Sequence, residues 1–296
     1  MIRFDAGTRT FRLEGATSRY AVHVDGKGRV LHLGWGSGGG DALSGRLIPF
    51  RAGEDQGEED QAQVHRLPFE YPAFGDLAHV EVALKVQFPT LPGGRRAGEA
   101  AHLPVRDLRP RYERHEIVID AEPGLAPAHR LPVRDPSPRR TLRIRMKDAL
   151  FPFFVTLCYR LTPELDILER WTELENGTDA PVEVEQCFFA ALHVPEGDHV
   201  LTTLGGPWGD EFHRERFPLP RGKTVLESRT LATSHEANPF FLLHRAGEAG
   251  ETSGEVLFGQ LAYSGNWRLV FDRQDPPGVR VYGGYNPFDF GLTLPP

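Results

Sequence analysis

The stretch that decides the fold is TLRIRMKDALFPFFVTLCYRL, residues 141–161. In its first half apolar and basic side chains alternate, Leu142, Ile144 and Met146 with Arg143, Arg145 and Lys147. A period of two is typical of a strand with one buried and one wet face. In the second half, Phe153–Leu161 is almost continuously apolar, which predicts a strand buried on both faces. The stretch therefore predicts neighbouring strands in a sandwich core.

Alternation of the same kind extends along much of the chain, and turn signals separate its segments. Asp25-Gly26 predicts a hairpin between Tyr20–Val24 and Val30–Leu33. Asn176-Gly177 predicts a second hairpin between Ile167–Leu174 and Val182–Leu192. Further strands are expected at Val80–Val86, Ile117–Ile119, Lys223–Arg229, Glu255–Tyr263, Trp267–Asp272 and Gly278–Tyr282.

Helical periodicity is weak, and 25 Pro with 32 Gly leave little room for a long amphipathic helix. The alternating strand and helix pattern of a parallel barrel is absent from the sequence. We therefore expect an all-β fold, a large antiparallel β-sandwich formed by residues 1–296 as one domain. Loops are expected at Gly34–Gly40, Gly53–Asp60 and Ala121–Arg140.

Composition narrows the class of protein. A net charge of −7 gives no reason to expect nucleic acid as a partner. No stretch approaches the roughly 20 apolar residues of a membrane span, and the N-terminus does not read as a secretory signal. Cys158 and Cys187 both lie in apolar runs, which favours buried free thiols over a disulfide. We expect a cytoplasmic protein.

Patterns that carry chemistry are scarce. The sequence has no HExxH, no Cys-His cluster with zinc spacing and no GxSxG. Glu211, His213 and Glu215 are close in sequence, but a solvated charge cluster is favoured over a metal site. No pair of carboxylates is identifiable as an acid and a nucleophile. We expect no catalytic residue, no metal and no cofactor.

Aromatic residues beside Gly and Pro are more informative, and they are Trp35, Trp208, Trp267, Tyr282, Tyr285, Phe288 and Phe290. The apolar C–H faces of sugars stack on such rings, which makes carbohydrate binding a physically reasonable interpretation. The alternative, which the residues alone favour, is that these rings fill the sandwich or an interface.

Six segments in one order resemble the α-galactosidases of glycoside hydrolase family 36. They are HLGWG (32–36), EYPAFGD (70–76), GPWGDEFHRERFPLPRG (206–222), SHEANPFFLL (234–243), GEVLFGQLAYSGNW (254–267) and RVYGGYNPFDFGLTLPP (280–296). One such motif is weakly specific, whereas six in order across nearly the whole chain are strongly specific.

The resemblance implies an N-terminal β-supersandwich of galactose-mutarotase-like architecture, which in the family precedes a (β/α)₈ barrel and a small β domain. It implies retaining hydrolysis of terminal non-reducing α-galactosyl residues, as in melibiose and raffinose, by two aspartates of the barrel. The family's sugar-lining tryptophan matches Trp208. Its loop aspartate, which reaches a neighbouring subunit, matches Asp55 with a shift, whereas simple alignment places Arg51 there.

We therefore expect a non-catalytic N-terminal domain that binds an α-galactoside through Trp208 and Asp55. Its expected partners are a catalytic barrel, in the same or a companion chain, and further copies in a homo-oligomer. The alternatives are a stand-alone sugar-binding or assembly module and an inert fragment of a split gene. Transfer in place of hydrolysis also stays open.

Overall fold

A computed structural model describes residues 1–37, 67–76, 80–89, 104–119, 139–233, 236–273 and 278–296. In this part of the chain the regular elements are strands, apart from the short 3₁₀ turn η2 (Pro163–Leu165). All pairings between these strands are antiparallel. The predicted all-β, antiparallel class is confirmed. Within the described ranges, no helix has the length and apolar character to cross a membrane.

Two four-stranded sheets come from the first two thirds of the chain, and each keeps its strands in sequence order. The first sheet contains β1 (Ile2–Asp5), β2 (Thr10–Glu14), β3 (Ser18–Val24) and β4 (Val30–Ser37). The second sheet contains β6 (Pro110–Ile119), β7 (Arg140–Asp148), β8 (Phe153–Thr162) and β9 (Ile167–Asn176).

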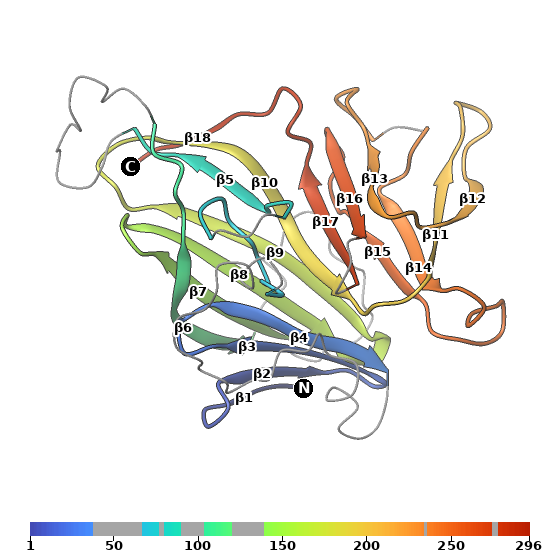
Figure 1. The fold of residues 1–296 in the computed structure, drawn as a ribbon, viewed down its shortest axis with the longest axis horizontal. Helices are drawn as coiled ribbons and strands as arrows, with labels where there is room; N and C mark the ends of the chain where they lie inside the picture. Colours follow the sequence, from blue (N-terminus) through green and yellow to red (C-terminus); the bar gives the residue numbers. More distant parts are fainter. Residues whose placement is uncertain (38–66, 77–79, 90–103, 120–138, 234–235, 274–277) are drawn as a thin grey trace.

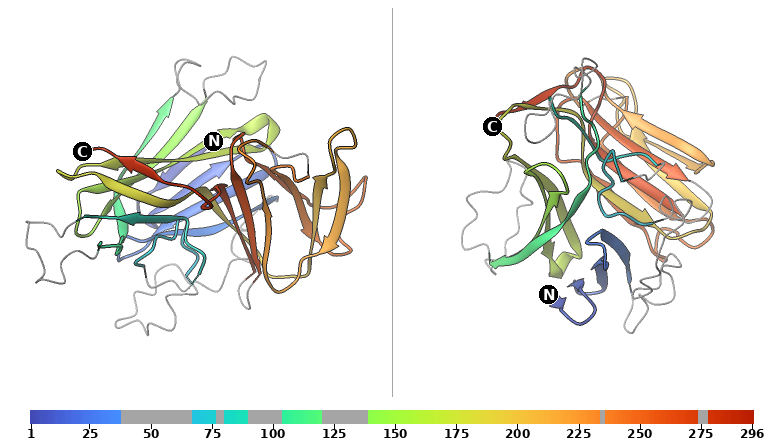
Figure 2. Two further views of the ribbon diagram at one scale, coloured as in Figure 1. Left: turned by 90° about the horizontal axis from the view of Figure 1, so that it is seen from above. Right: turned by 60° about the vertical axis from the view of Figure 1, so that its left-hand side comes forward.

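The other two sheets draw on strands distant in sequence. A six-stranded sheet has the order β13 (Gly222–Glu227), β16 (Trp267–Arg273), β17 (Val279–Tyr285), β10 (Val182–Val194) and β18 (Leu292–Leu294), with β5 (Leu84–Gln87) also paired to β10. The fourth sheet has the order β12 (His213–Pro218), β11 (His199–Gly205), β14 (Phe240–Arg245) and β15 (Leu257–Gln260). It lies at the end of the molecule away from β6–β9 (Figures 1 and 2).

Strands β7 and β8 confirm the prediction from the opening stretch. Leu142, Ile144 and Met146 are buried, while Arg143 and Arg145 point to the other face and form ion pairs with Glu173 and Glu175 of β9. Strand β8 is buried along nearly its whole length. The alternation of β7 and the continuous apolar run of β8 therefore reflect different burial within one sheet.

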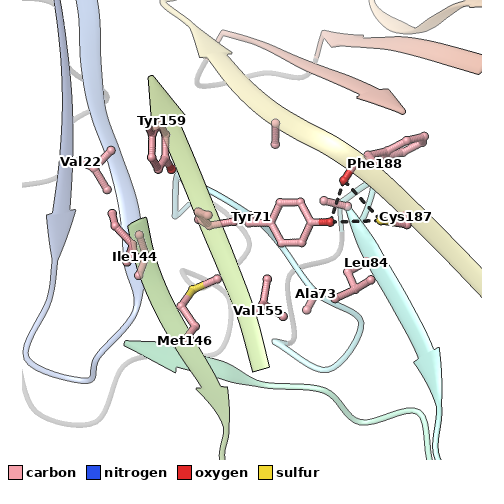
Figure 3. Close-up of a cluster of buried hydrophobic side chains, with 14 of the residues drawn as sticks. Val22, Tyr71, Ala73, Leu84, Ile144, Met146, Val155, Tyr159, Cys187 and Phe188 are labelled. Atoms are coloured by element: carbon pink, nitrogen blue, oxygen red, sulfur yellow. Dashed lines mark hydrogen bonds between the residues drawn. The ribbon is translucent and has the colours of Figure 1, made fainter. Parts of the chain in front are cut away.

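Hydrophobic side chains form two cores. The first core lies among β1–β5, β6–β9 and β10 (Figure 3), where the Tyr71 hydroxyl donates a hydrogen bond of 2.7 Å to the Phe188 carbonyl. The second lies between the six-stranded sheet and the fourth sheet. Successive residues of the sheet divide between them: Val270 belongs to the first core, whereas Leu269 and Phe271 belong to the second. Strands β16 and β17 of the six-stranded sheet are thus buried on both faces.

The hairpin predicted at Asp25-Gly26 is confirmed, because β3 pairs with β4. The hairpin predicted at Asn176-Gly177 is wrong. Strand β9 pairs with β8, and β10 pairs with β17, β5 and β18 in another sheet. The Asn176 amide donates to the carbonyls of Ala180, Leu294 and Pro295, so it anchors a crossing between sheets at this point.

The structure changes the limits of some predicted strands and loops. Of the segment Val80–Val86, only the end is a strand, because β5 begins at Leu84. The glycine-rich run Gly34–Gly40 was expected as a loop, but Gly34–Ser37 continue β4 and pair with β3. Residues 38–40, the acidic segment Gly53–Asp60 and residues 121–138 lie outside the described residues. Cys158 and Cys187 are free and buried as predicted, and burial raises the pKa of Cys187 to about 11.

Asp166 links two turns that are far apart in sequence. It follows η2 in the left-handed region, at φ 52°, and its carboxylate accepts hydrogen bonds from the backbone amides and hydroxyls of Thr17 and Ser18. Partial desolvation raises the pKa of Asp166, but these hydrogen bonds lower it more, so it lies below its ordinary value. The carboxylate thereby fastens the β2–β3 turn to the β8–β9 turn.

We predict that Asp166→Ala lowers the free energy of unfolding by about 1–2 kcal/mol, since the charged hydrogen bonds lie at the surface. Asp166→Asn should cost less, because asparagine tolerates the left-handed region and keeps one acceptor oxygen. Urea unfolding of the three proteins measures both differences. An alanine variant as stable as the wild type would contradict this role.

Candidate functional site

Loops from two sheets meet along one edge, which we call the rim and define as residues 206–212, 228–233, 236–239, 261–266 and 286–291. Hydrogen bonds join the loops 228–233, 261–266 and 286–291, because Thr233 N donates to Ser264 O and Asn286 N to Asn266 O, each at 3.0 Å. Asn238 N donates to Leu204 O, at the end of β11, also at 3.0 Å. In Figure 1 the rim is the upper edge of the orange and red strands. Each loop is placed there because its flanking strands end together in register.

Trp208 lies at the tip of the loop between β11 and β12. The tight turn is closed by a 3.0 Å hydrogen bond from Asp210 N to Pro207 O. Gly206, at φ 140°, is required there, because a Cβ atom would lie 2.1 Å from the Asp210 carbonyl oxygen. The turn leaves the indole 84 % exposed. A flat apolar ring held in water by a constrained turn is suited to stacking on the face of a sugar.

The other aromatic residues singled out from the sequence divide between core and rim. Trp267 and Tyr282 are fully buried, which agrees with the core interpretation for these two rings. Trp35 is half-buried, and its indole N–H donates to the His193 carbonyl at 3.0 Å. Tyr285 and Phe290 stack on each other with ring centroids 5.1 Å apart, while Phe288 is 52 % exposed on the rim.

Charged residues beside Trp208 form a surface pair. His213 Nε2 lies 2.7 Å from Asp210 Oδ1, and both side chains are more than half exposed. Glu211 turns back to accept a hydrogen bond from Gly209 N at 2.9 Å. Among the residues that the structure describes, no group of three or more His, Cys, Asp or Glu side chains is arranged to hold a metal ion. This geometry is that of the solvated charge cluster favoured from the sequence.

A second polar constellation, centred on Glu70, lies deep in the first core. The backbone of residues 67–70 runs along β4, with hydrogen bonds from His32 N to Pro68 O at 2.7 Å and from Glu70 N to Val30 O at 2.9 Å. The carboxylate of Glu70 is fully buried and meets the Arg170 guanidinium of β9 at 2.8 Å.

Three further side chains complete this buried cluster of Tyr20, His32, Glu70, Tyr159 and Arg170. The hydroxyls of Tyr20 and Tyr159 donate to Glu70 Oε1, the second at 3.0 Å, and His32 Nδ1 lies 3.3 Å from Oε2. The guanidinium of Arg170 lies over both tyrosine rings, with its carbon 5.6 and 4.8 Å from their centroids. It also donates to the Ala191 carbonyl of β10 at 2.6 Å. The cluster thus connects β3, β4, β8, β9 and β10.

Burial works to raise the pKa of Glu70, but Arg170 and the hydrogen bond from His32 lower it to about 2. The carboxylate is therefore an ionised partner within a closed network and is sealed from solvent, which suits a structural role. Sequence reasoning missed this cluster. A charged residue inside the apolar run LPFEYPAF, residues 67–74, was the available signal, because a buried carboxylate requires a partner.

Other buried carboxylates are engaged in the same structural manner. Asp76 forms a 2.6 Å ion pair with Arg111, and Asp25 forms a 2.5 Å ion pair with Arg29. Asp148 accepts hydrogen bonds from backbone amides, including that of Arg109 at 2.6 Å. The predicted site residue Asp55 and its alternative Arg51 lie outside the described residues, so their position relative to Trp208 stays a prediction.

Comparison with known proteins identifies the family. Residues 28–295 match the model of the glycosyl hydrolase family 36 N-terminal domain. The chain is 30% identical over 300 residues to α-galactosidase AgaA of Geobacillus stearothermophilus, covering 100% of this chain and 39% of the relative.

Solved structures of family 36 α-galactosidases contain the same fold. The crystal structure of α-galactosidase AgaB from Geobacillus stearothermophilus has a TM-score of 0.81 and 29% identity, covering 100% of this chain and 39% of that one. An AgaA variant from the same organism, in complex with stachyose, has a TM-score of 0.82 and 28% identity, covering 97% of this chain and 38% of that one. The chain thus spans about two fifths of the length of these relatives. It belongs to the glycosyl hydrolase family 36 N-terminal domain family and corresponds to the N-terminal domain of these α-galactosidases.

Proposed function

We propose that this chain is the non-catalytic N-terminal part of an α-galactosidase that hydrolyses terminal non-reducing α-galactosyl residues. The observation that carries the proposal is Trp208, an 84 % exposed indole on a constrained turn within the segment that resembles the family's sugar-lining motif. The two catalytic aspartates would be supplied by a barrel in the same or a companion chain.

Stacking gives Trp208 a physical role in this proposal. The C–H face of a galactosyl ring is apolar, and an indole covers it without needing a polar partner. Solved complexes support the substrate class, since variants of the relative AgaA were crystallised with stachyose and with raffinose. That galactosides are also the substrates of the enzyme to which the present chain belongs is part of the proposal.

Several finer features belong to the same proposal. The four sheets would form one domain, a β-supersandwich of galactose-mutarotase-like architecture, and the protein would assemble as a cytoplasmic homo-oligomer. Asp55, or Arg51 in its place, would contact the sugar site of a neighbouring subunit. Two buried free thiols support a reducing compartment.

The test begins with the pure 296-residue chain on a chromogenic α-galactoside, where we expect no turnover. Co-expression with the polypeptide encoded directly downstream should yield an active complex. In that complex Trp208→Ala should lower kcat/KM about tenfold, which is a loss of about 1.4 kcal/mol of binding to the transition state. The matched control is Phe258→Ala, a 54 % exposed ring on β15 outside the rim.

Two outcomes would contradict the proposal. Turnover by the pure chain would show that it carries its own catalytic groups. Calorimetry with melibiose that shows binding by the isolated chain, lost in Trp208→Ala, together with an inactive co-expressed pair, would favour the stand-alone sugar-binding module. The exposed indole of Trp208 is the observation that supports this second candidate.

A further inference from the structure

A buried histidine, His193 of β10, lies against the first sheet. Its imidazole stacks on that of His32 of β4, with ring centroids 5.3 Å apart and ring planes inclined by 25°. The Nε2 atom of His193 lies 2.9 Å from the Phe69 carbonyl oxygen, and the His193 carbonyl accepts the indole N–H of Trp35 at 3.0 Å. His193 therefore fastens β10 both to β4 and to the segment that contains Phe69. We call His193, His32, Phe69 and Trp35 the histidine clasp.

The hydrogen bond to Phe69 fixes where the neutral His193 ring carries its proton. A carbonyl oxygen only accepts, so Nε2 must donate, and Nδ1 is then a bare acceptor. Nδ1 is buried, and it has no hydrogen-bond partner within the part of the chain that the structure describes. A second proton would therefore create a charged donor in a buried position without an acceptor there, which is costly.

The charges around His193 also oppose a second proton. The charged and titratable groups near it on the surrounding elements are His32 of β4, Glu70 beside β4, Arg170 of β9 and Arg280 of β17, with Asp272 of β16 opposite Arg280. Glu70 is paired with Arg170 at 2.8 Å, whereas the buried Arg280 is the residue directly opposite His193 in the sheet. Burial, His32 and Arg280 lower the pKa of His193 to about 3, although the Phe69 carbonyl and Glu70 act to raise it.

We propose that the histidine clasp opens in acid, because a proton taken up on His193 Nδ1 drives the ring out of its buried position. The new N–H must find an acceptor, and it finds one in water only if the ring leaves its place. The stacking on His32 and the hydrogen bond to the Phe69 carbonyl are then lost together. Acid thereby loosens the junction of β4 with β10 before it unfolds the rest of the chain. This behaviour does not depend on the proposed function.

The lowered pKa sets the direction of the effect. The closed clasp holds the pKa of His193 near 3, whereas the open clasp returns it to its ordinary value of 6.5. Above about pH 6.5 the ring is neutral in both forms, and the clasp keeps its full stability. Below that pH only the open form takes up the proton, so opening becomes more favourable by about tenfold per pH unit until the pH approaches 3. The opening constant should rise about fiftyfold between about pH 6.5 and about pH 4.5.

Amide hydrogen exchange of the 296-residue chain, read by mass spectrometry at about pH 6.5 and about pH 4.5, tests the proposal. The informative variant is His193→Gln, because its side-chain amide can still donate to the Phe69 carbonyl but takes up no proton in this range. We compare the exchange rate of the wild type with that of the variant at each pH. In peptides that cover β4 and residues 67–76, this ratio should be about fiftyfold higher at the lower pH. In peptides that cover β7 and β8 it should change less than about twofold.

The matched control is His213→Gln, which removes a histidine whose side chain is 60 % exposed. Its exchange in the β4 peptides should stay within about twofold of the wild type at both pH values. A ratio of wild type to His193→Gln that is the same at both pH values overturns the proposal. A fiftyfold change shared by β7 and β8 also overturns it, because acid would then unfold the whole chain rather than open the clasp.

Nuclear magnetic resonance of the wild type, with ¹⁵N-labelled histidine, keeps the proposal testable if His193→Gln does not fold. The closed clasp should show the His193 ring as the neutral tautomer with its proton on Nε2 down to about pH 4.5. A His193 ring that titrates near pH 6.5, its ordinary value, while the β4 amides stay protected would show that the buried site accepts the proton without opening. That result overturns the proposal.

Discussion

Replacement of Arg170 by methionine should lower the free energy of unfolding by about 3–5 kcal/mol. The side chain of Arg170 is 8 % exposed and lies 2.8 Å from the fully buried Glu70 carboxylate. Methionine fills similar volume but leaves the carboxylate without its counter-charge and removes the hydrogen bonds to Tyr20 and the Ala191 carbonyl. Urea unfolding at about pH 7 measures the loss.

Two controls separate charge from packing. Arg170→Lys keeps the positive charge with fewer donors, so its loss should be intermediate. The double variant Arg170→Met with Glu70→Leu removes both charges and should be more stable than Arg170→Met alone. A double variant less stable than the single one would show that the network, not the unpaired charge, accounts for the loss.

The stability lost in Arg170→Met should depend on pH, because Glu70 titrates. The pKa of Glu70 is about 2 in the fold against an ordinary value of 4.5, so its stabilisation is complete above about pH 4.5 and is lost as the pH falls toward 2. Without Arg170 we expect burial to outweigh the hydrogen bonds from His32 and Tyr20 and to raise the pKa of Glu70, so that protonation relieves the unpaired charge in the folded state. The difference in stability between wild type and Arg170→Met should therefore narrow between about pH 7 and about pH 4.5.

Gly284→Ala should destabilise the protein by about 3 kcal/mol or more, because the new methyl group collides with main chain. A Cβ atom at Gly284 would lie 2.4 Å from Phe188 Cα, 2.7 Å from Phe189 N and 2.8 Å from the Cys187 carbonyl oxygen. These atoms belong to β10 where its register with β17 shifts between Phe188 and Ala190. Strand β17 has little freedom to move away, since it is buried on both faces and paired with β10 on one side and β16 on the other.

The matched control is Gly291→Ala. No atom lies within 4 Å of a Cβ placed on Gly291, and its φ is not positive, so the change should stay within about 0.5 kcal/mol of the wild type. Thermal or urea unfolding of both variants tests the comparison. Equal stability of Gly284→Ala and the wild type would show that β10 and β17 can separate locally at low cost.

Local patterns in the sequence predicted the strands that depend on local burial. The alternation of Leu142, Ile144 and Met146 and the apolar run of β8 identified both the strands and their environments. The positive φ angles of Leu231 and Phe212 could not be predicted from the sequence, because leucine and phenylalanine rarely adopt the left-handed conformation.

Local sequence patterns could not predict which strands pair when those strands are far apart in sequence. Asn176-Gly177 has the composition of a hairpin turn, but the amide of Asn176 contacts residues near the C-terminus and β10 leaves for another sheet. The Glu70 cluster was missed for a related reason, since its members come from segments far apart in sequence. Trp208 could be named as a candidate because its motif is local, whereas the loops of the rim around it could not be predicted, and its role in sugar binding stays a prediction.

Strand β10 takes its partners from β5, far upstream, and from β17 and β18 at the other end of the chain. During synthesis on a ribosome, the centre of the molecule therefore cannot close until the final strands have emerged from the exit tunnel. Until then apolar side chains of β10 that pack against β17 lack their partners, which leaves the nascent chain prone to aggregation. The pairing of β10 with β17 and β18 therefore determines how late in synthesis the core around β10 can be completed.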